Sequence, residues 1–72
     1  MVSNVVNLPN RNTYLQRLHS RFTECASTCA RMARECREAG DYRHAEAYTA
    51  SQTAWEHAAR DVRAIMMELG NE

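Results

Sequence analysis

Three cysteines are the residues in this sequence whose side chains most readily suggest chemistry. Cys25, Cys29 and Cys36 are separated by four and seven positions, a spacing that places their thiols along one face of a helix rather than around one ion. Tetrahedral zinc requires four donors. The sequence also has three histidines, His19, His44 and His57. None of them falls on the same helical face as the thiols, so we expect no metal site.

The thiols also lack the surroundings that catalysis requires. A nucleophilic thiol needs a neighbouring base and partial exposure, and the sequence places no such base beside it. It has no glycine-rich phosphate loop and no His-Glu-x-x-His motif. We therefore expect no catalytic residue, no cofactor and no enzymatic activity. An odd number of cysteines makes a poor disulfide framework, which favours free thiols that pack as small apolar side chains.

The arginines form two clusters. Arg17 and Arg21 are four residues apart, and Arg31 and Arg34 are three apart, so each pair lies on one side of a helix. Such pairs can bind phosphates or the carboxylates of a partner. The alternative is an ordinary solvated helix face. Nucleic-acid or partner contact through these four residues therefore remains a hypothesis at this stage.

The chain that carries these residues contains two long stretches without helix breakers. We expect a flexible N-terminal segment over residues 1–9, closed by Pro9, and a helical hairpin over residues 10–72. The first helix is predicted over about 11–39, with Asn10 or Asn12 as its N-cap. Gly40 and Asp41 form the predicted turn at 40–41. The second helix is predicted over about 42–69, where Gly70 follows.

A short connection forces two such helices to run antiparallel. Apolar residues and thiols recur at heptad spacing in both helices and predict the stripe on which they meet. The predicted hairpin core consists of Leu15, Leu18, Phe22, Cys25, Cys29, Met32, Cys36, Ala45, Tyr48, Trp55, Val62, Met66 and Leu69. Ala39 continues the stripe and Gln52 interrupts it. With the turn at residues 40–41, Cys25 should lie opposite Trp55.

A second row of small or apolar residues on the second helix predicts a dimer. This row is Ala47, Ser51, Ala54, Ala58 and Ile65. Domains of fewer than about 70 to 80 residues usually need a staple, a metal or oligomerisation, so we expect a homodimeric four-helix bundle with this row as its seam. The alternative is that these alanines only favour helix at exposed positions.

Charge is divided unequally between the helices. Residues 11–39 contain six Arg and three Glu, a net charge of +3, whereas residues 41–72 contain three Arg and six acidic residues, a net charge of −3. The two helices should therefore attract each other across the hairpin, and the same asymmetry could fix the pairing in a dimer. The whole chain of 72 residues has a net charge of zero, which predicts no long-range attraction to nucleic acid or lipid.

Length and composition place the protein in a broad class. A chain of 72 residues forms one small domain, and 44% apolar with 25% charged residues is typical of a folded helical chain. No apolar run reaches the roughly 18 residues of a membrane span, and the first residues lack the features of a signal peptide. We expect a cytoplasmic protein that does not interact with membranes.

Two resemblances bear on function. A hairpin of two equal helices with cysteines in its core is similar in pattern to the Rop-type plasmid proteins, which dimerise and bind paired RNA loops. The segment from Cys29 through Gly40, Asp41 and Tyr42 to Trp55, about half the chain, resembles small helical regulators of enteric bacteria and temperate phages, some of which silence transcription activators. This resemblance implies a protein-binding regulator and assigns no residue a role.

The leading hypothesis is therefore a small non-enzymatic regulatory protein that acts through protein–protein interaction. It is expected to form a homodimer and to bind a protein partner such as a transcription regulator. The alternative is Rop-like binding of RNA or DNA through the arginine clusters. A structural assembly subunit would differ from both by forming higher oligomers.

Overall fold

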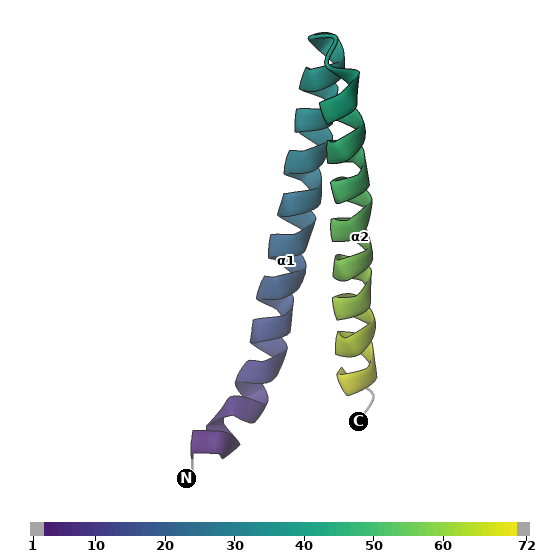
Figure 1. The fold of residues 1–72 in the computed structure, drawn as a ribbon. Coiled ribbons are helices and arrows are strands. Elements are labelled where there is room, and N and C mark those ends of the chain that lie inside the picture. Colours follow the sequence, from purple (N-terminus) through teal and green to yellow (C-terminus); the bar gives the residue numbers. More distant parts are fainter. Residues whose placement is uncertain (1–2, 71–72) are drawn as a thin grey trace.

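The protein is a pair of long antiparallel helices joined by a tight turn. The computed structural model describes the backbone of residues 3–70 and the side chains of residues 11–70. Helix α1 comprises Ser3–Glu38 and helix α2 comprises Tyr42–Gly70. The helices lie side by side, and both chain ends are at the end remote from the turn (Figure 1). The predicted all-α helical hairpin is confirmed.

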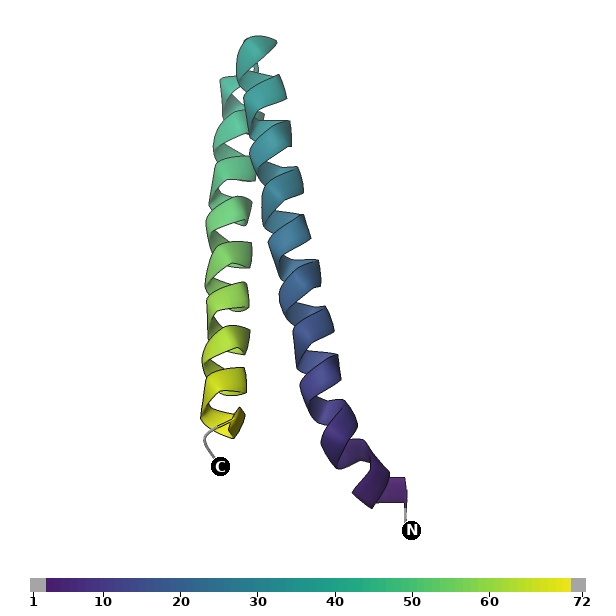
Figure 2. The same cartoon turned by 180° about the vertical axis from the view of Figure 1, so that it is seen from behind.

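Helix α1 begins earlier than the sequence predicts. It starts at Ser3, so the predicted start at Asn10 or Asn12 is wrong, and residues 3–9 are helical. Residues 1 and 2 of the predicted flexible segment lie outside the described residues. Proline costs a helix interior one backbone hydrogen bond, but its fixed φ is compatible with helix. The first turns of α1, drawn in purple, bend away from the line of the rest (Figures 1 and 2), as expected beside a proline.

Gly40 ends α1 with a left-handed residue. Its φ is +81°, a conformation that glycine adopts without the steric penalty of a Cβ atom. The Asp41 N–H donates to the Cys36 carbonyl at 2.8 Å, and the Gly40 N–H donates to the Arg37 carbonyl at 3.0 Å. These two bonds form a Schellman motif, which satisfies carbonyls that a helix end otherwise leaves without partners.

Asp41 caps the N-terminus of α2. Its Oδ1 accepts from the backbone N–H of His44 at 3.3 Å, and its Oδ2 lies 2.7 Å from His44 Nδ1. The hydrogen bond from the His44 side chain, followed by that from the His44 backbone, lowers the pKa of the Asp41 carboxyl below its ordinary value of 3.8. The turn thus consists of a glycine that ends α1 and, directly after it, a carboxylate that caps the N-terminus of α2.

The helices meet along a line of small residues. The most buried residues among the described side chains are Ala26, Ala33, Ala45, Ala59 and Val62. Ala45 and Val62 belong to the predicted core, whereas Ala26 and Ala33 lie one position after Cys25 and Met32. One position turns about 100° around a helix, so the contact line lies beside the predicted stripe rather than at its centre.

Alanine at the contact line allows the helix axes to approach closely, and bulkier neighbours then project to one side. The other predicted core residues are accordingly half-buried, and Ala39 is exposed. Among the described residues, no large side chain is fully buried.

The molecule is a thin rod with little interior. Its principal extents are 56 × 22 × 13 Å, and its radius of gyration is 16.7 Å, against about 11 Å for a compact domain of this length. The accessible surface is 5639 Å², whereas a folded monomer of 8.3 kDa exposes about 4,600 Å². The chain thus exposes roughly 1,000 Å² more than a compact protein of its size.

Candidate interaction surfaces

The apolar side chains of the hairpin gather on one side of the contact line. We define this apolar face by its residues, Leu15, Leu18, Phe22, Cys25, Cys29, Met32 and Cys36 from α1 and Tyr48, Trp55, Val62, Met66 and Leu69 from α2. All are half-buried except Val62, which is buried. The partner helix therefore covers only part of each of these side chains.

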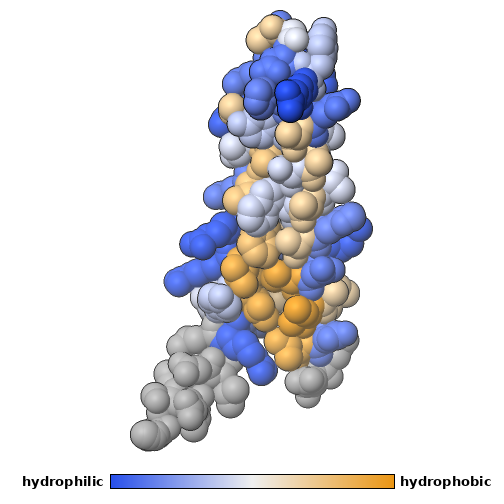
Figure 3. Space-filling model, viewed as in Figure 1, coloured by the Kyte–Doolittle hydropathy of each residue, from blue (hydrophilic) through white to orange (hydrophobic). Residues whose placement is uncertain are grey.

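The apolar face is not uniform along its length. Seen from the side of Figure 1, an apolar band follows the line between the helices and is most hydrophobic in the half remote from the turn (Figure 3). The residues of that half include Leu15, Leu18, Phe22, Met66 and Leu69, whereas the half beside the turn contains Cys29, Met32, Cys36 and Tyr48. Ile65, at the open end, is 45% exposed.

The single tryptophan packs against a phenylalanine near the middle of this face. The ring centroids of Phe22 and Trp55 are 5.3 Å apart, with the ring planes tilted by 38°, a favourable aromatic arrangement. Trp55 also lines a shallow recess with Cys25 and Cys29. Trp55 was expected opposite Cys25, and it borders the same recess as Cys25 while its ring also packs against that of Phe22. The three thiols are free and half-buried.

The predicted dimer seam lies along the outer flank of α2. Ala58 is half-buried, and Ala47, Ser51, Ala54 and Ile65 are exposed. By helical spacing this row adjoins Val62 and Leu69 of the apolar face. The hairpin itself covers little of the row.

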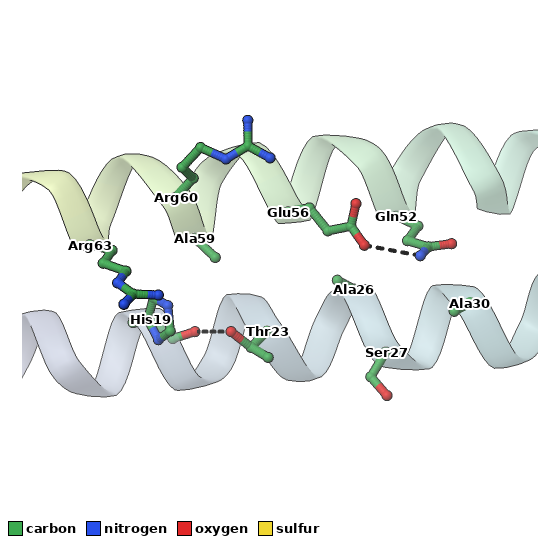
Figure 4. A pocket seen from close by; sticks show the side chains of 10 residues that line it. All are labelled: His19, Thr23, Ala26, Ser27, Ala30, Gln52, Glu56, Ala59, Arg60 and Arg63. Carbon is green, nitrogen blue, oxygen red and sulfur yellow. Dashed lines mark hydrogen bonds between the residues drawn. The ribbon is translucent and has the colours of Figure 1, made fainter.

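A second surface runs along the hairpin and contains no residue of the apolar face. It is a groove of about 410 Å³. We call it the polar groove and define it by its lining, His19, Thr23, Ala26, Ser27, Ala30, Gln52, Glu56, Ala59, Arg60 and Arg63. Figure 4 shows Ala26 and Ala59 on the facing sides of the two helices and the polar side chains along the margins.

Some polar side chains of this groove have hydrogen-bond partners, and its two arginines have no carboxylate partner among the described side chains. Gln52 Nε2 donates to Glu56 Oε2 at 3.0 Å, and the Thr23 hydroxyl donates to the His19 carbonyl at 2.8 Å (Figure 4). Gln52, predicted as the one polar group of the inner stripe, is thus half-buried at the groove margin. Arg60 and Arg63 have no carboxylate within 4.0 Å among the described side chains. The groove can therefore accept carboxylate groups of a partner.

The arginine clusters lie on exposed parts of α1. Arg17, Arg21, Arg31 and Arg34 are all exposed. Arg17 and Arg21 line a shallow recess with Tyr14 and Leu18, so this pair borders the apolar face. Among the described residues, no carboxylate lies within 4.0 Å of the charged groups of Arg31 and Arg34.

The expected attraction between oppositely charged helices produces no direct pair. Among the described side chains, the one pair of acidic and basic groups within 4.0 Å is Asp41 with His44. The polar link between the helices is a hydrogen bond from Arg37 Nη2 to the Thr49 hydroxyl at 2.9 Å. The attraction expected between the oppositely charged helices therefore involves no direct ion pair among the described side chains, because alanine and apolar side chains occupy the contact line and the charged residues are exposed.

The described part of the chain offers neither a cluster of metal ligands nor a membrane-spanning helix. No group of three or more His, Cys, Asp or Glu side chains is arranged to hold a metal ion within it. No helix over the same residues has both the length and the apolar character to cross a membrane.

The sequence patterns did not predict Ala26 and Ala33 at the centre of the core, and they did not predict the polar groove. A signal was present, since Ala26 and Ala33 are seven residues apart on α1, which is the spacing of a helix seam. Alanine is also a common residue at exposed helical positions, so this spacing alone did not distinguish a seam from a surface.

Comparison of this chain with protein-family models, with curated proteins and with solved structures finds no match.

Proposed function

We propose that this protein is a small, non-enzymatic regulatory protein of the cytoplasm that acts by binding another protein, and that it does so as a homodimer. The observation that carries the proposal is the chemical difference between the two long surfaces of the hairpin. The apolar face fits a second copy, and the polar groove, in which Arg60 and Arg63 pair with no carboxylate of residues 11–70, is left for a partner.

Burial supports the dimer. The side chains of residues 11–70 include five buried ones, four of them alanine, which is a small core for a chain of this length. A standard interface buries about 800 Å² on each partner, comparable with the roughly 1,000 Å² by which the hairpin exceeds a compact monomer. Pairing two apolar faces produces a four-helix bundle in which the half-buried aromatic and aliphatic side chains become core.

The dimer can be tested by sedimentation equilibrium of two matched variants. Leu18→Asp places a charge on the apolar face, and Met67→Asp makes the same kind of change at a side chain that is 63% exposed and outside that face. We expect the wild type and Met67→Asp to sediment as dimers. Leu18→Asp should raise the dimer dissociation constant at least about tenfold, or about 1.4 kcal/mol, because burying a charge without a partner is costly.

Either of two results would contradict the dimer. One is a wild-type species of 8.3 kDa that stays helical at micromolar concentration. The other is equal weakening by both substitutions.

The resemblance to small helical regulators supports a transcription regulator as the partner. Affinity capture from the native host tests this with wild type, Met67→Asp and Leu18→Asp as baits, each with and without nuclease treatment. The proposal predicts a discrete protein that is retained by the first two baits and is insensitive to nuclease. Arg60→Glu with Arg63→Glu in the groove should abolish capture of that protein without changing the sedimentation of the bait.

The alternative is binding of RNA or DNA, and the exposed Arg17 and Arg21 favour it. Phosphate binding has a steep salt dependence, so affinity for structured RNA or duplex DNA should fall sharply between low and physiological salt. The double substitution Arg17→Ala with Arg21→Ala should then abolish binding at unchanged helicity. No binding at low salt excludes this alternative.

A further inference from the structure

The proposed second copy on the apolar face could pack in more than one orientation, and the structure favours one of them. Two hairpins that pack face to face can be related by a two-fold axis along the helices or by one across them. The first places both turns at the same end of the bundle, and the second places them at opposite ends. This question rests on the proposed dimer and concerns its internal arrangement.

The two orientations bring different helices together. With the turns at the same end, α1 of one copy packs beside α2 of its partner, and the two run antiparallel. With the turns at opposite ends, α1 packs beside α1 and α2 beside α2. Since residues 11–39 carry a net charge of +3 and residues 41–72 carry −3, the first arrangement places opposite charges side by side and the second places like charges side by side.

The gradient along the apolar face favours the same choice. Leu15, Leu18, Phe22, Met66 and Leu69 lie in the half remote from the turn, which is the most hydrophobic part of the face (Figure 3). In same-end pairing, this half is covered by the same hydrophobic half of the partner. Full-length opposite-end pairing would cover it with the half that contains Cys36 and Tyr48, which offers less apolar surface for burial.

Particular charged residues border the face at matching positions. Arg21 lines recesses with Leu18 on one side and with Cys25 and Trp55 on the other, so it lies at the edge of the apolar face on α1. Asp61 continues the row of Ala47 and Ala54 at intervals of seven, which places it on the outer flank of α2. Both residues are exposed.

Arg21 and Asp61 are also equally far from the turn. Each lies about 20 residues from it, or roughly 30 Å along its helix. They are on different flanks of one hairpin and form no ion pair with each other within it. In a same-end bundle, however, Arg21 comes level with the partner's Asp61 on an adjacent helix. Opposite-end pairing would instead bring Arg21 about level with the partner's Arg31.

We propose that two copies pair through their apolar faces with both turns at the same end, and that Arg21 of each copy contacts Asp61 of the other. Charged residues that flank an apolar helix seam select the partner and its orientation in this way. The two contacts are equivalent by symmetry, so each dimer contains both.

Charge reversal on separate chains tests the contact. Arg21→Glu alone places Glu beside Asp61, and Asp61→Arg alone places Arg beside Arg21, so each homodimer should be weakened. An equimolar mixture restores both contacts in the heterodimer. With one chain isotopically labelled, native mass spectrometry should show a ratio of heterodimer to homodimers that is about tenfold above its statistical value, from two contacts of modest strength.

A matched pair of variants controls for the effect of charge alone. Arg34 and Glu46 are exposed, lie about equally far from the turn, and point away from the apolar face by helical spacing. Mixing Arg34→Glu with Glu46→Arg should give the statistical distribution. Heterodimer enrichment in this pair equal to that of the Arg21 and Asp61 pair would overturn the proposed contact.

A cross-link in the otherwise unaltered protein reports orientation independently. The sequence has no lysine, and Ala39, which continues the apolar stripe at the turn, is exposed. With Ala39→Lys, a short amine-reactive cross-linker should join the introduced side chains of the two copies, as seen in mixed labelled and unlabelled chains.

Failure of the proposed orientation and failure of the proposed dimer give different results. A dimer in sedimentation with neither heterodimer enrichment nor this cross-link overturns the orientation and leaves the dimer standing. A wild-type monomer overturns the dimer itself.

Discussion

At the scale of single residues, the pair Asp41 and His44 shows how the turn is stabilised. The carboxylate accepts from the backbone and the ring of His44, next to the positive end of the α2 dipole. Both interactions favour the ionised carboxylate, and this is why the pKa of Asp41 is lowered.

The sign of the resulting pH dependence follows from this direction. A carboxylate with a lowered folded-state pKa stabilises the fold above its unfolded pKa, and this contribution is lost as the pH falls through the folded-state pKa. We therefore expect the contribution of Asp41 to be present above about pH 4 and to disappear below 3.8.

The variant Asp41→Asn isolates this charge, because asparagine caps helices about as well as aspartate. The difference in melting temperature between wild type and Asp41→Asn should be positive at neutral pH and should shrink towards zero on acidification below 3.8. A difference that is constant down to strongly acidic pH would contradict the role of the ionised carboxylate.

Ala33 tests the contact line at the same scale. It is 2% exposed, so Ala33→Leu would insert three carbons where the helices approach most closely. We expect a loss of about 1–3 kcal/mol in the free energy of unfolding, measured by urea denaturation. Ala64→Leu, at an exposed position of α2, should stay within about 0.5 kcal/mol of wild type. Similar values for the two variants would place the contact line elsewhere.

At the scale of elements, the hairpin depends on how α1 ends. Gly40 has a φ of +81°, and a Cβ added there would meet no atom within 4 Å. The cost of a side chain at this position is therefore conformational and not a collision. Asp41 follows Gly40 directly and caps α2, which begins at Tyr42, and this short connection fixes the helices as antiparallel neighbours.

Gly40→Ala should accordingly lower the free energy of unfolding by about 1–2 kcal/mol, the cost of a left-handed alanine. Gly70→Ala is the matched control, since Gly70 is the last residue of α2 and has no positive φ. It should leave stability unchanged or raise it slightly, because alanine favours helix. Chemical denaturation of both variants at one protein concentration would show the contrast, and equal effects would argue against the turn geometry.

At the scale of the whole molecule, the rod-like shape leaves two long outer surfaces, the apolar face and the polar groove. A layer only 13 Å thick has two broad sides and almost no interior. One side carries the apolar face, and the other side carries the polar groove. The proposed dimer would cover the first side and leave the second accessible, so stability and partner binding would use different surfaces of the same helices.

Much of this arrangement is already present in the sequence. The long stretches without glycine or proline determine two helices, and Gly40 with Asp41 determines where the chain reverses, because backbone conformation at these positions is a local property. The charge asymmetry of the helices and the heptad recurrence of apolar residues are also read directly from the residues. Pro9 misled the prediction of the first helix, since its effect depends on whether the preceding residues can continue the helix.

Only the tertiary structure decided how the two helices turn towards each other. The stripe from Leu15 to Cys36 is wide enough to face the other helix or to lie beside it, and the sequence does not distinguish these rotations. Ala26 and Ala33 occupy the contact line because small side chains permit the closest approach of two helix axes. That rotation moves the thiols and large apolar groups to one side and opens the polar groove, so both candidate surfaces follow from packing between the helices.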